Sequence, residues 1–564
     1  MLCARPLLFR SACLSKSIPS RPFSKDSAAA SYDVVIVGGG LSGLALAAAI
    51  GSLPLARELL NIALVDASDL TRKYNWNSDP HTYSSSVCSI TNASREFLDS
   101  IGVWQHVEQS RTSPIESMQV WDGISNSRIC FSNSDIDPGG SIFEMARLTE
   151  NLNLHRALLH RLDEIPGRVE LIDQVKVESI TRSGTWPVVN LSGGRSLQTR
   201  LLIGADGFKS PVRSFAQIGS SGWAYPSHAV VGTLHHPSSN HPQHNTTAYQ
   251  RFLPTGPIAF LPLTKEVSTV VWSTSVQLAS ILRSVHPDVL AHLINAAFRL
   301  PEVSIRYLHS ILLERGADGI TPESITEEIK FRENAHGIGP HSALYSSDVV
   351  SLGVGIPPIG SEAYPPLVHS VQAGSQASFP LKLSHADSYV GEGVGERTAL
   401  VGDAAHTVHP LAGQGLNMGL EDARVLAQTI GEALSLGGDI GSYISLIPYH
   451  TARYAPNHAI ISVIDKLHKL YSLTSPPAVW ARSVGLEVLN ELGPIKSALM
   501  GVAGSKTKQD MAEPLQHYGA AGWHAAATVV ESLSGGIRTG KVVAGSLGGL
   551  VSSLVQNAAK NTRG

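Results

Sequence analysis

Three glycines near the start of the chain have the spacing of a phosphate-binding turn. Gly38, Gly40 and Gly43 follow the apolar run 32–37 and precede the alanine- and leucine-rich run 44–50. This order predicts a strand, a tight turn and a helix. Gly38 would reverse the chain, Gly40 would let the backbone approach a pyrophosphate, and Gly43 would let helix and strand pack closely. Since the positive end of the helix would face the phosphates, the segment predicts a dinucleotide site.

Acidic residues and glycines also end three later apolar runs. They are Asp66 after 62–65, Asp206 and Gly207 after 201–205, and Gly402 and Asp403 after 399–401. Asp66 stands where an acid that hydrogen-bonds an adenosine ribose is expected. Because the carboxyl ends of parallel strands meet at one edge of a sheet, segments more than 350 residues apart would converge on one nucleotide. The first turn alone does not distinguish NAD from FAD.

With these later motifs the chain resembles the single-component flavoprotein aromatic hydroxylases. That family binds FAD through a GxGxxG turn, a DG pair and a GD pair, which 206–207 and 402–403 match in this order. The resemblance implies that Asp403 holds the ribityl chain and that the DG pair contacts the flavin and transiently docks nicotinamide. It also implies that loop 409–417 lies beneath the flavin ring, with backbone N–H groups facing the pyrimidine end. This loop would contribute Pro410, Gly413, Gly415 and Asn417 to the FAD site.

Longer strings are similar to one branch of this family, the ubiquinone-biosynthesis monooxygenases, and particularly to its mitochondrial ring C5-hydroxylases. The strings are 250–263 (QRFLPTGPIAFLPL), 271–274 and 379–385. Neither packing nor flavin chemistry dictates the first of them. The resemblance implies C5 hydroxylation of a polyprenylated phenol by a hydroperoxide at flavin C4a. It further implies ferredoxin and ferredoxin reductase, or NAD(P)H, as electron donors, and other ubiquinone-biosynthesis proteins as partners.

One departure from the branch keeps other functions open. The branch carries an asparagine–arginine pair whose arginine faces the flavin, and Ser85 and Ser86 occupy that place here. Arg95, nine positions further on, is either a substitute for that arginine or a solvated helix residue. The alternatives are a non-catalytic scaffold subunit of a membrane-associated complex, or a flavin hydroxylase for another aromatic substrate.

The sequence does not reveal a dedicated catalytic base. His385, Tyr249 and Tyr389 are weak candidates for the partner of a phenol, and a structural role is the simpler interpretation of each. Because a flavin hydroperoxide decays in water, we expect a dry pocket with an apolar roof. His406 and His409 are three apart but lie in the predicted flavin loop, so we expect loop hydrogen bonding and no metal site.

The elements that must position these residues predict an α/β protein. We expect a Rossmann-like FAD-binding domain interleaved with an antiparallel β-sheet substrate domain, followed by a C-terminal helical extension. The expected FAD-binding domain comprises 31–112, 143–216 and 395–470; the substrate domain comprises 113–142 and 217–394, with an insertion at about 281–378; the extension comprises 471–564.

The first thirty residues differ in composition from the rest of the chain. They hold five basic residues and one acid among leucines and serines, which is typical of a mitochondrial transit peptide, with an unstructured basic tail as the alternative. The whole chain has 43 basic and 46 acidic residues, so removing this segment leaves a net charge of −7. Nucleic-acid binding is therefore not expected. Only Cys88 and Cys130 remain of the four cysteines, which argues against a disulfide framework.

The C-terminal part carries an apolar pattern of its own. Between 519 and 559 large apolar residues recur at three- and four-residue intervals, although several glycines would weaken an isolated helix. Such a helix packs on its own protein or lies on a membrane surface. No apolar run reaches the roughly eighteen residues of a transmembrane helix. We therefore expect a peripheral protein on the matrix side of the mitochondrial inner membrane.

Overall fold

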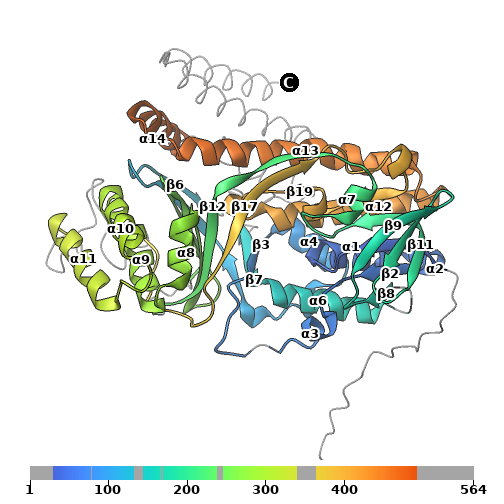
Figure 1. Cartoon of the computed structure of the whole chain (residues 1–564), viewed down its shortest axis with the longest axis horizontal. Helices are drawn as coiled ribbons and strands as arrows, with labels where there is room; N and C mark the ends of the chain where they lie inside the picture. Colours follow the sequence, from blue (N-terminus) through green and yellow to red (C-terminus); the bar gives the residue numbers. More distant parts are fainter. Residues whose placement is uncertain are drawn as a thin grey trace, which may run out of the picture.

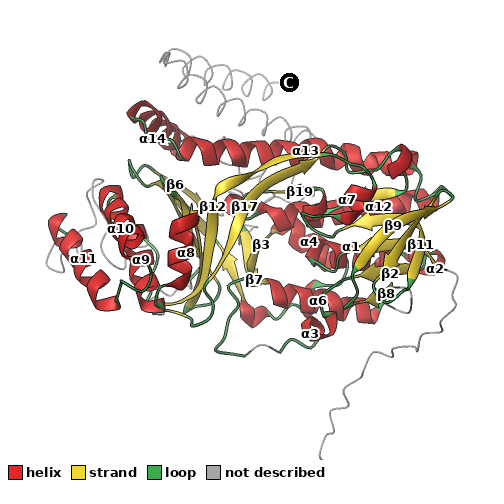
Figure 2. Ribbon diagram, in the orientation of Figure 1, coloured by secondary structure: helices red, strands yellow, loops and turns green. Residues whose placement is uncertain are grey.

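The computed structural model describes residues 29–77, 79–132, 144–165, 167, 169–237, 245–338 and 364–491. Within these residues the chain forms three β-sheets with helices packed around them (Figure 1, Figure 2). Almost all of the expected transit peptide and the whole apolar pattern at 519–559 lie outside the described residues.

A seven-stranded sheet carries the predicted dinucleotide turn. Strand β1 (Ala30–Val37) pairs in parallel with β2 (Ile62–Val65) and β11 (Ser196–Gly204), and β18 (Thr398–Leu400) pairs in parallel with β11. The last four residues of β1 are buried, as expected for an apolar strand of a parallel sheet covered on both faces. The predicted convergence of these strand ends on one edge is confirmed. The other strands are β8 (Val169–Ile172), β9 (Val177–Ser183) and β10 (Trp186–Leu191).

Two helices that are far apart in the sequence pack together beside this sheet. They are α1 (Leu41–Ser52), rich in alanine and mostly buried, and α12 (Gln414–Ser435). Small side chains let the two helices approach closely, and their contact joins the first and last motifs of the chain. The smaller helices of this part are α2 (Pro54–Leu59), α3 (Leu70–Tyr74), α4 (Asn92–Ser100), α6 (Asn151–Glu164) and α7 (Pro211–Phe215).

A nine-stranded, mostly antiparallel sheet forms the second layer. Its strands are β5 (Ser117–Asp122), β6 (Arg128–Ser132), β12 (Ser220–His235), β13 (Thr247–Leu253), β14 (Gly256–Pro262), β15 (Val267–Ser275), β16 (Ser370–Val371), β17 (Ala377–Ala386) and β19 (His406–Thr407). One face packs against helices α8 (Val276–Ser284), α9 (Pro287–Arg299), α10 (Glu302–Arg315) and α11 (Pro322–Ala335). These four helices fall in or next to the predicted insertion, so its described part is mainly a helical lobe (Figure 1).

A small three-stranded sheet lies between the two larger ones. It has the order β3 (Val87–Thr91), β7 (Ala146–Glu150), β4 (Thr112–Ile115), and all of its pairs are antiparallel. Apolar residues of this sheet and of the nine-stranded sheet share one core cluster, which includes Ile115, Leu148 and Leu263. The small sheet therefore connects the seven-stranded sheet, which carries the dinucleotide turn, to the nine-stranded sheet. We call the nine-stranded sheet the roof, because it corresponds to the predicted roof of the substrate pocket.

The last two described helices tie both large sheets together. Helix α13 (Tyr443–Tyr471) runs along one side of the molecule, and α14 (Pro476–Glu491) follows it (Figure 1). Tyr449 of α13 belongs to the core of the seven-stranded sheet, whereas Tyr471 packs with strands β5, β6 and β13. The expected extension after residue 470 therefore begins with helix α14, which packs on the nine-stranded sheet.

Candidate functional site

Close contacts require two of the glycines that follow β1. Gly38 has φ +113°, and a Cβ there would lie 2.2 Å from the carbonyl oxygen of Ala205. A Cβ on Gly43 would lie 2.0 Å from the carbonyl oxygen of Gly38. A Cβ on Gly40, in contrast, would meet nothing within 4 Å. Because the first turn of α1 has no acidic residue and no side-chain cap, its N–H groups can bind an anion beside Gly40.

Asp66 closes the same turn from the end of β2. Its Oδ2 accepts a hydrogen bond from the N–H of Gly39 at 2.5 Å, and its Oδ1 accepts from the N–H of Ser68 at 2.7 Å. A carboxylate oxygen can accept more than one hydrogen bond, so these contacts leave capacity for a ribose hydroxyl. The predicted ribose contact of Asp66 stays a prediction.

Asp206 and Asp403 follow β11 and β18. Asp206 accepts from the N–H of Val212 at 3.1 Å through Oδ2, while its Oδ1 is buried and has no hydrogen-bond partner among the described residues. Burial raises the pKa of Asp206. Asp403 has an exposed side chain, yet the protein packed around it also raises its pKa, against the opposing effect of His406. Oδ1 of Asp206 and the exposed carboxylate of Asp403 can each accept hydrogen bonds, so both carboxylates suit hydroxyl groups of a ligand.

Arg213 joins the loops that carry these two acids. Its guanidinium donates to the carbonyl oxygens of Ala404 and Phe208, each at 2.6 Å. On the opposite side, a Cβ on Gly402 would lie 2.9 Å from the hydroxyl of Ser42 in α1, and Gly402 itself has φ +58°. The dinucleotide turn, the DG loop with Gly207 (φ +80°) and the GD loop therefore meet at one place.

Loop 409–417 is held in shape from within the protein. His409 accepts from the N–H of Leu411 at 3.1 Å, the 3-10 turn η5 (Pro410–Ala412) follows, and Gly413 adopts the left-handed conformation at φ +61° just before α12. The Asn417 amide accepts from the N–H of Thr91 at 3.0 Å and donates to the carbonyl oxygen of Ser89 at 2.8 Å. Asn417 therefore anchors the loop to β3, while a Cβ on Gly415 would meet only Val408, at 3.5 Å.

A buried polar network lies behind the GD loop, and its centre, Asp422, was not predicted from the sequence. Asp422 bonds to Nε2 of His406 at 2.6 Å and to Nε of Arg453 at 2.9 Å, and it accepts from the N–H of Gly402 at 3.2 Å. Its neighbours His406 and Arg453 hold the pKa of Asp422 well below its usual range despite burial. A carboxylate on the otherwise buried face of α12 was the only sequence signal for this network.

The three weak catalytic candidates do not meet at one point. His385 and Tyr389 are hydrogen-bonded at 3.0 Å, and Asn457, a member of the Asp422 network, donates to Tyr389 at 3.2 Å. Tyr389 is fully buried, and burial lowers the pKa of His385 to about 4, so this histidine is neutral at physiological pH. Tyr249 packs edge-to-face on Phe260 in the core between the nine-stranded sheet and the helical lobe.

The face of the nine-stranded sheet that is turned toward these loops carries many apolar side chains. Two clusters cover it, and each includes a residue of loop 406–417 or its helix. Their members include, from the sheet, Val120, Ala229, Val271 and Leu381 and, from the loop and its helix, Val408, Leu411 and Met418. An apolar surface opposite the flavin loop suits chemistry that water would abort.

Ser86 and Arg95, the two residues considered at the place of the missing arginine, both have partners within the protein, and the side chain of Arg95 is 42% exposed on helix α4. The hydroxyl of Ser86 accepts from the amide of Asn151 at 2.8 Å. Arg95 forms an ion pair with Glu144 and lies over the ring of Trp104 at 5.4 Å. Arg95 is thus engaged by its own surroundings, and a flavin contact by it stays a prediction. Within the described ranges no group of three or more His, Cys, Asp or Glu side chains has the geometry to hold a metal ion.

Comparisons with known proteins decide which family has this arrangement. The family model described as "FAD binding domain" matches residues 31–308 and 375–451. The mitochondrial ubiquinone biosynthesis monooxygenase COQ6 of Saccharomyces cerevisiae is 37% identical over 495 residues, covering 86% of this chain and 96% of that protein. The human COQ6 is 35% identical and covers 84% of this chain and 92% of its own. The chain belongs to the ubiquinone biosynthesis monooxygenase family.

As a family member the chain is an FAD-dependent monooxygenase. Solved structures agree on the fold: a probable FAD-dependent monooxygenase from Pseudomonas aeruginosa, PqsL, matches with a TM-score of 0.53 at 20% identity, covering 81% of this chain and 100% of its own. The p-nitrophenol 4-monooxygenase PnpA from Pseudomonas putida matches with a TM-score of 0.56 at 15% identity, covering 84% of this chain and 97% of its own. The residues around Gly40, Asp206 and Asp403 fit the cofactor, because they offer an anion site and two carboxylates to hydroxyl groups.

Proposed function

We propose that this chain hydroxylates the aromatic ring of a polyprenylated phenol at C5 during ubiquinone biosynthesis. The observation that carries the proposal is the apolar surface of the nine-stranded sheet opposite loop 409–417, to which alternate residues of the string 250–263, such as Phe252 and Leu261, contribute. The relatives named above act in ubiquinone biosynthesis, whose intermediates combine an electron-rich ring with an apolar tail. Bound FAD, once reduced, activates O₂ and supplies one oxygen atom to such a ring.

The residues of the chain would bind and orient the cofactor and keep water out. Gly38, Gly40 and Gly43 would admit the pyrophosphate, Asp66 would bind the adenosine ribose, and Asp403 would bind the ribityl chain. Asp206 with Gly207, and the loop from Pro410 to Gly415, would contact the flavin. Asn417 would act by holding that loop against β3. Figure 1 shows α1, β11 and α12, the elements beside which these segments lie.

Partners and location complete the proposal. Ferredoxin with its reductase, or NAD(P)H, would supply electrons, and other ubiquinone-biosynthesis proteins would bind nearby. The relatives are named as mitochondrial, and the first thirty residues have the composition of a transit peptide. None of the described helices is both long enough and apolar enough to span a bilayer. We place the protein peripherally on the matrix side of the inner membrane.

The test is a turnover assay with purified holoprotein. A phenol carrying a short prenyl chain is incubated with the protein, O₂, and either ferredoxin with its reductase or NADPH, and the product is analysed by mass spectrometry and NMR. One added oxygen at C5 supports the proposal, and addition at another position corrects it. A flavin-loaded protein that hydroxylates no prenylated phenol with either donor contradicts it and leaves the scaffold alternative.

A further inference from the structure

A buried ion pair lies beside segment 79–86, the segment in which the family arginine is missing. Arg111 ends the 3-10 turn η2 (Gln109–Arg111) before β4, and Glu150 ends β7, so adjacent strands bring the two together. Nε of Arg111 lies 2.5 Å from Oε2 of Glu150, and Nη2 lies 2.9 Å from Oε1. The side chains are 4% and 1% exposed. This two-point geometry fixes the orientation of the guanidinium as well as its position.

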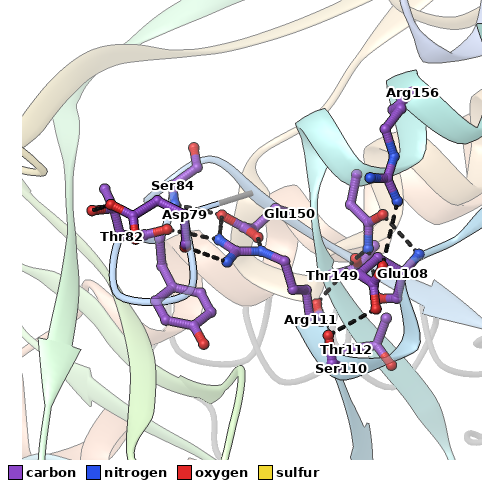
Figure 3. A network of polar contacts seen from close by, with 12 residues as sticks. Asp79, Thr82, Ser84, Glu108, Ser110, Arg111, Thr112, Thr149, Glu150 and Arg156 are labelled. Carbon is purple, nitrogen blue, oxygen red and sulfur yellow. Dashed lines mark hydrogen bonds and ion pairs between the residues drawn. The ribbon is translucent and has the colours of Figure 1, made fainter. Parts of the chain in front are cut away.

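The pair holds segment 79–86 by its backbone. Arg111 donates through Nη1 to the carbonyl oxygen of Asp79 at 2.9 Å and through Nη2 to that of Thr82 at 2.8 Å. Glu150 accepts from the N–H of Ser84 at 2.6 Å. Figure 3 shows the loop around Asp79, Thr82 and Ser84 wrapped about the two charged side chains. Because this segment has no helix or strand of its own, these bonds fix its conformation.

The same segment is held from the roof side by a glutamine. Gln372, which follows β16, accepts from the N–H of Tyr83 at 2.9 Å and donates to the carbonyl oxygen of Tyr83 at 2.9 Å. The ring of Tyr83 lies 4.1 Å from the Arg111 guanidinium and packs against the core cluster shared with the roof. One residue of the segment is thus attached to the nine-stranded sheet while its neighbours are attached to the small sheet.

The segment continues directly into the strand that supports the flavin loop. After Ser86 the chain enters β3, whose Ser89 and Thr91 hold the Asn417 amide. A Cβ on Gly413 would also be in contact with the Cβ of Ser89, at 3.5 Å. The spacing between flavin loop and roof therefore depends on where segment 79–86 sits.

We propose that Arg111 and Glu150 are positioning residues for the oxygenation reaction. Their buried pair fixes segment 79–86 and, through it, the distance between the flavin loop and the roof; this rests on the ring hydroxylation proposed above. Neither side chain is placed against substrate or cofactor. A loosened segment would misplace the aromatic ring of the substrate or admit water to the site. Reduced FAD would then pass both electrons to O₂, which takes up two protons and leaves as hydrogen peroxide.

The test variant is Arg111→Lys. Lysine keeps the charge beside Glu150 but cannot reproduce the planar fork or the bonds to Asp79 and Thr82. We expect FAD to be retained, hydrogen–deuterium exchange of the peptide covering 79–86 to accelerate, and product formed per O₂ consumed to fall. Since a misplacement of about 1 Å costs up to a hundredfold in rate, the hydroxylation rate should fall on the order of tenfold to a hundredfold.

The chain offers a matched control in a second buried pair. Arg482 of α14 lies 2.9 Å from Asp122, with side chains 1% and 0% exposed. Arg482→Lys should lower thermal stability comparably without accelerating exchange at 79–86 and without releasing peroxide. If Arg111→Lys accelerates exchange but couples O₂ to product like the wild type, the pair is only structural and the proposal is overturned.

Two further measurements keep the proposal testable in every case. If Arg111→Lys does not fold, Gln372→Ala decides, because it removes both Gln372 bonds to Tyr83 without leaving a buried charge and leaves the longer bond from the Thr233 hydroxyl to the Tyr83 carbonyl oxygen, at 3.3 Å; unchanged coupling in that variant overturns the proposal. If the wild type hydroxylates no phenol, the proposed substrate fails, and visible circular dichroism of bound FAD then decides. A changed flavin spectrum in Arg111→Lys but not in Arg482→Lys supports the proposal, and identical spectra overturn it.

Discussion

At the scale of single residues, the surroundings of the glycines and acids distinguish the residues that the fold requires from those that are available to the cofactor. A side chain on Gly38 or Gly43 would collide with backbone, whereas one on Gly40 would enter open space. Asp66 is already engaged by two N–H groups, but Asp403 has no hydrogen bond recorded within the described protein. We expect the cofactor to bind at positions that have a polar atom without a hydrogen bond to the described protein, or open space where a side chain would extend.

Asp403→Ala should abolish most FAD binding without unfolding the protein. Loss of hydrogen bonds between a carboxylate and the ribityl hydroxyls costs about 1.5–3 kcal/mol, which corresponds to roughly a tenfold to hundredfold weaker affinity. Titration of apoprotein followed by flavin fluorescence measures it. Asp318→Ala, at an exposed position of the helical lobe, is the control and should bind FAD like the wild type. Equal affinity of both variants would remove Asp403 from the site.

His309 makes stability dependent on pH. Its ring nitrogens are buried and have no hydrogen-bond partner within the described ranges, and burial lowers the pKa of His309 to about 4. Because the folded pKa lies below the unfolded value of about 6.5, the contribution of this neutral histidine is complete above that pH and is lost as pH falls toward 4. Between pH 7 and pH 5 the wild type should lose about 2 kcal/mol that His309→Leu keeps. Urea unfolding at both pH values measures the difference, and parallel losses would contradict it.

At the scale of elements, the hydrophobic periodicity and the glycine spacing of the sequence predicted the strands and helices next to the glycine motifs. The runs 32–37 and 62–65 are strands β1 and β2, and the helix after the last glycine motif is α12. The small sheet of β3, β4 and β7, and the Arg111–Glu150 pair at its end, were not predicted. Their pairing depends on contacts between distant, individually ordinary residues, which leave no local pattern.

The turn before α1 gives a prediction at this scale. Gly40→Ala should leave the stability of the apoprotein within about 1 kcal/mol, because φ at Gly40 is −73° and the added methyl meets no atom within 4 Å. It should nevertheless weaken FAD binding on the order of tenfold by crowding the pyrophosphate. Gly43→Ala should lower the free energy of unfolding of the apoprotein by about 1–3 kcal/mol, since its methyl group would collide with the Gly38 carbonyl. Thermal unfolding with and without FAD separates the two, and similar behaviour of both variants would contradict the assignment.

A buried ion pair links helix α14 to the nine-stranded sheet, beside the apolar contacts of Leu486. Arg482 binds Asp122 and also donates to the carbonyl oxygens of Leu470, Tyr471 and Leu473 at the end of α13. Arg482→Leu leaves a buried carboxylate without its cation and should cost about 3–5 kcal/mol. Adding Asp122→Asn should restore part of this loss, which denaturant unfolding of the single and double variants measures. Additive losses would show that the two residues do not act as a pair.

At the scale of the whole molecule, two distant sequence regions build one site, with a roof inserted between them. The sequence predicted this interleaving through the resemblance of its motifs, and the order β8-β2-β1-β11 with β18 beside β11 supplies the physical reason. It could not predict how the roof is spaced from the flavin loop, because that spacing depends on the small sheet, on Gln372 and on α13.

Membrane association is a prediction for the full chain. The apolar pattern at 519–559 and the apolar tail of the proposed substrate suggest binding to a bilayer surface. The full-length protein should co-sediment with vesicles of mitochondrial lipid composition, and a chain that ends at residue 491 should remain in the supernatant while retaining FAD. Equal binding of both chains would assign the membrane contact to another part of the molecule.

The central claim is that FAD bound between these distant loops transfers an oxygen atom from O₂ to a prenylated ring. The most direct measurement is the product mass after a single turnover of photoreduced holoprotein with isotopically labelled O₂ and a short-chain prenylated phenol. The account predicts one labelled oxygen atom on the ring, and loss of this product in Asp403→Ala. Flavin reoxidation that yields only hydrogen peroxide, with the phenol recovered unchanged, would contradict it.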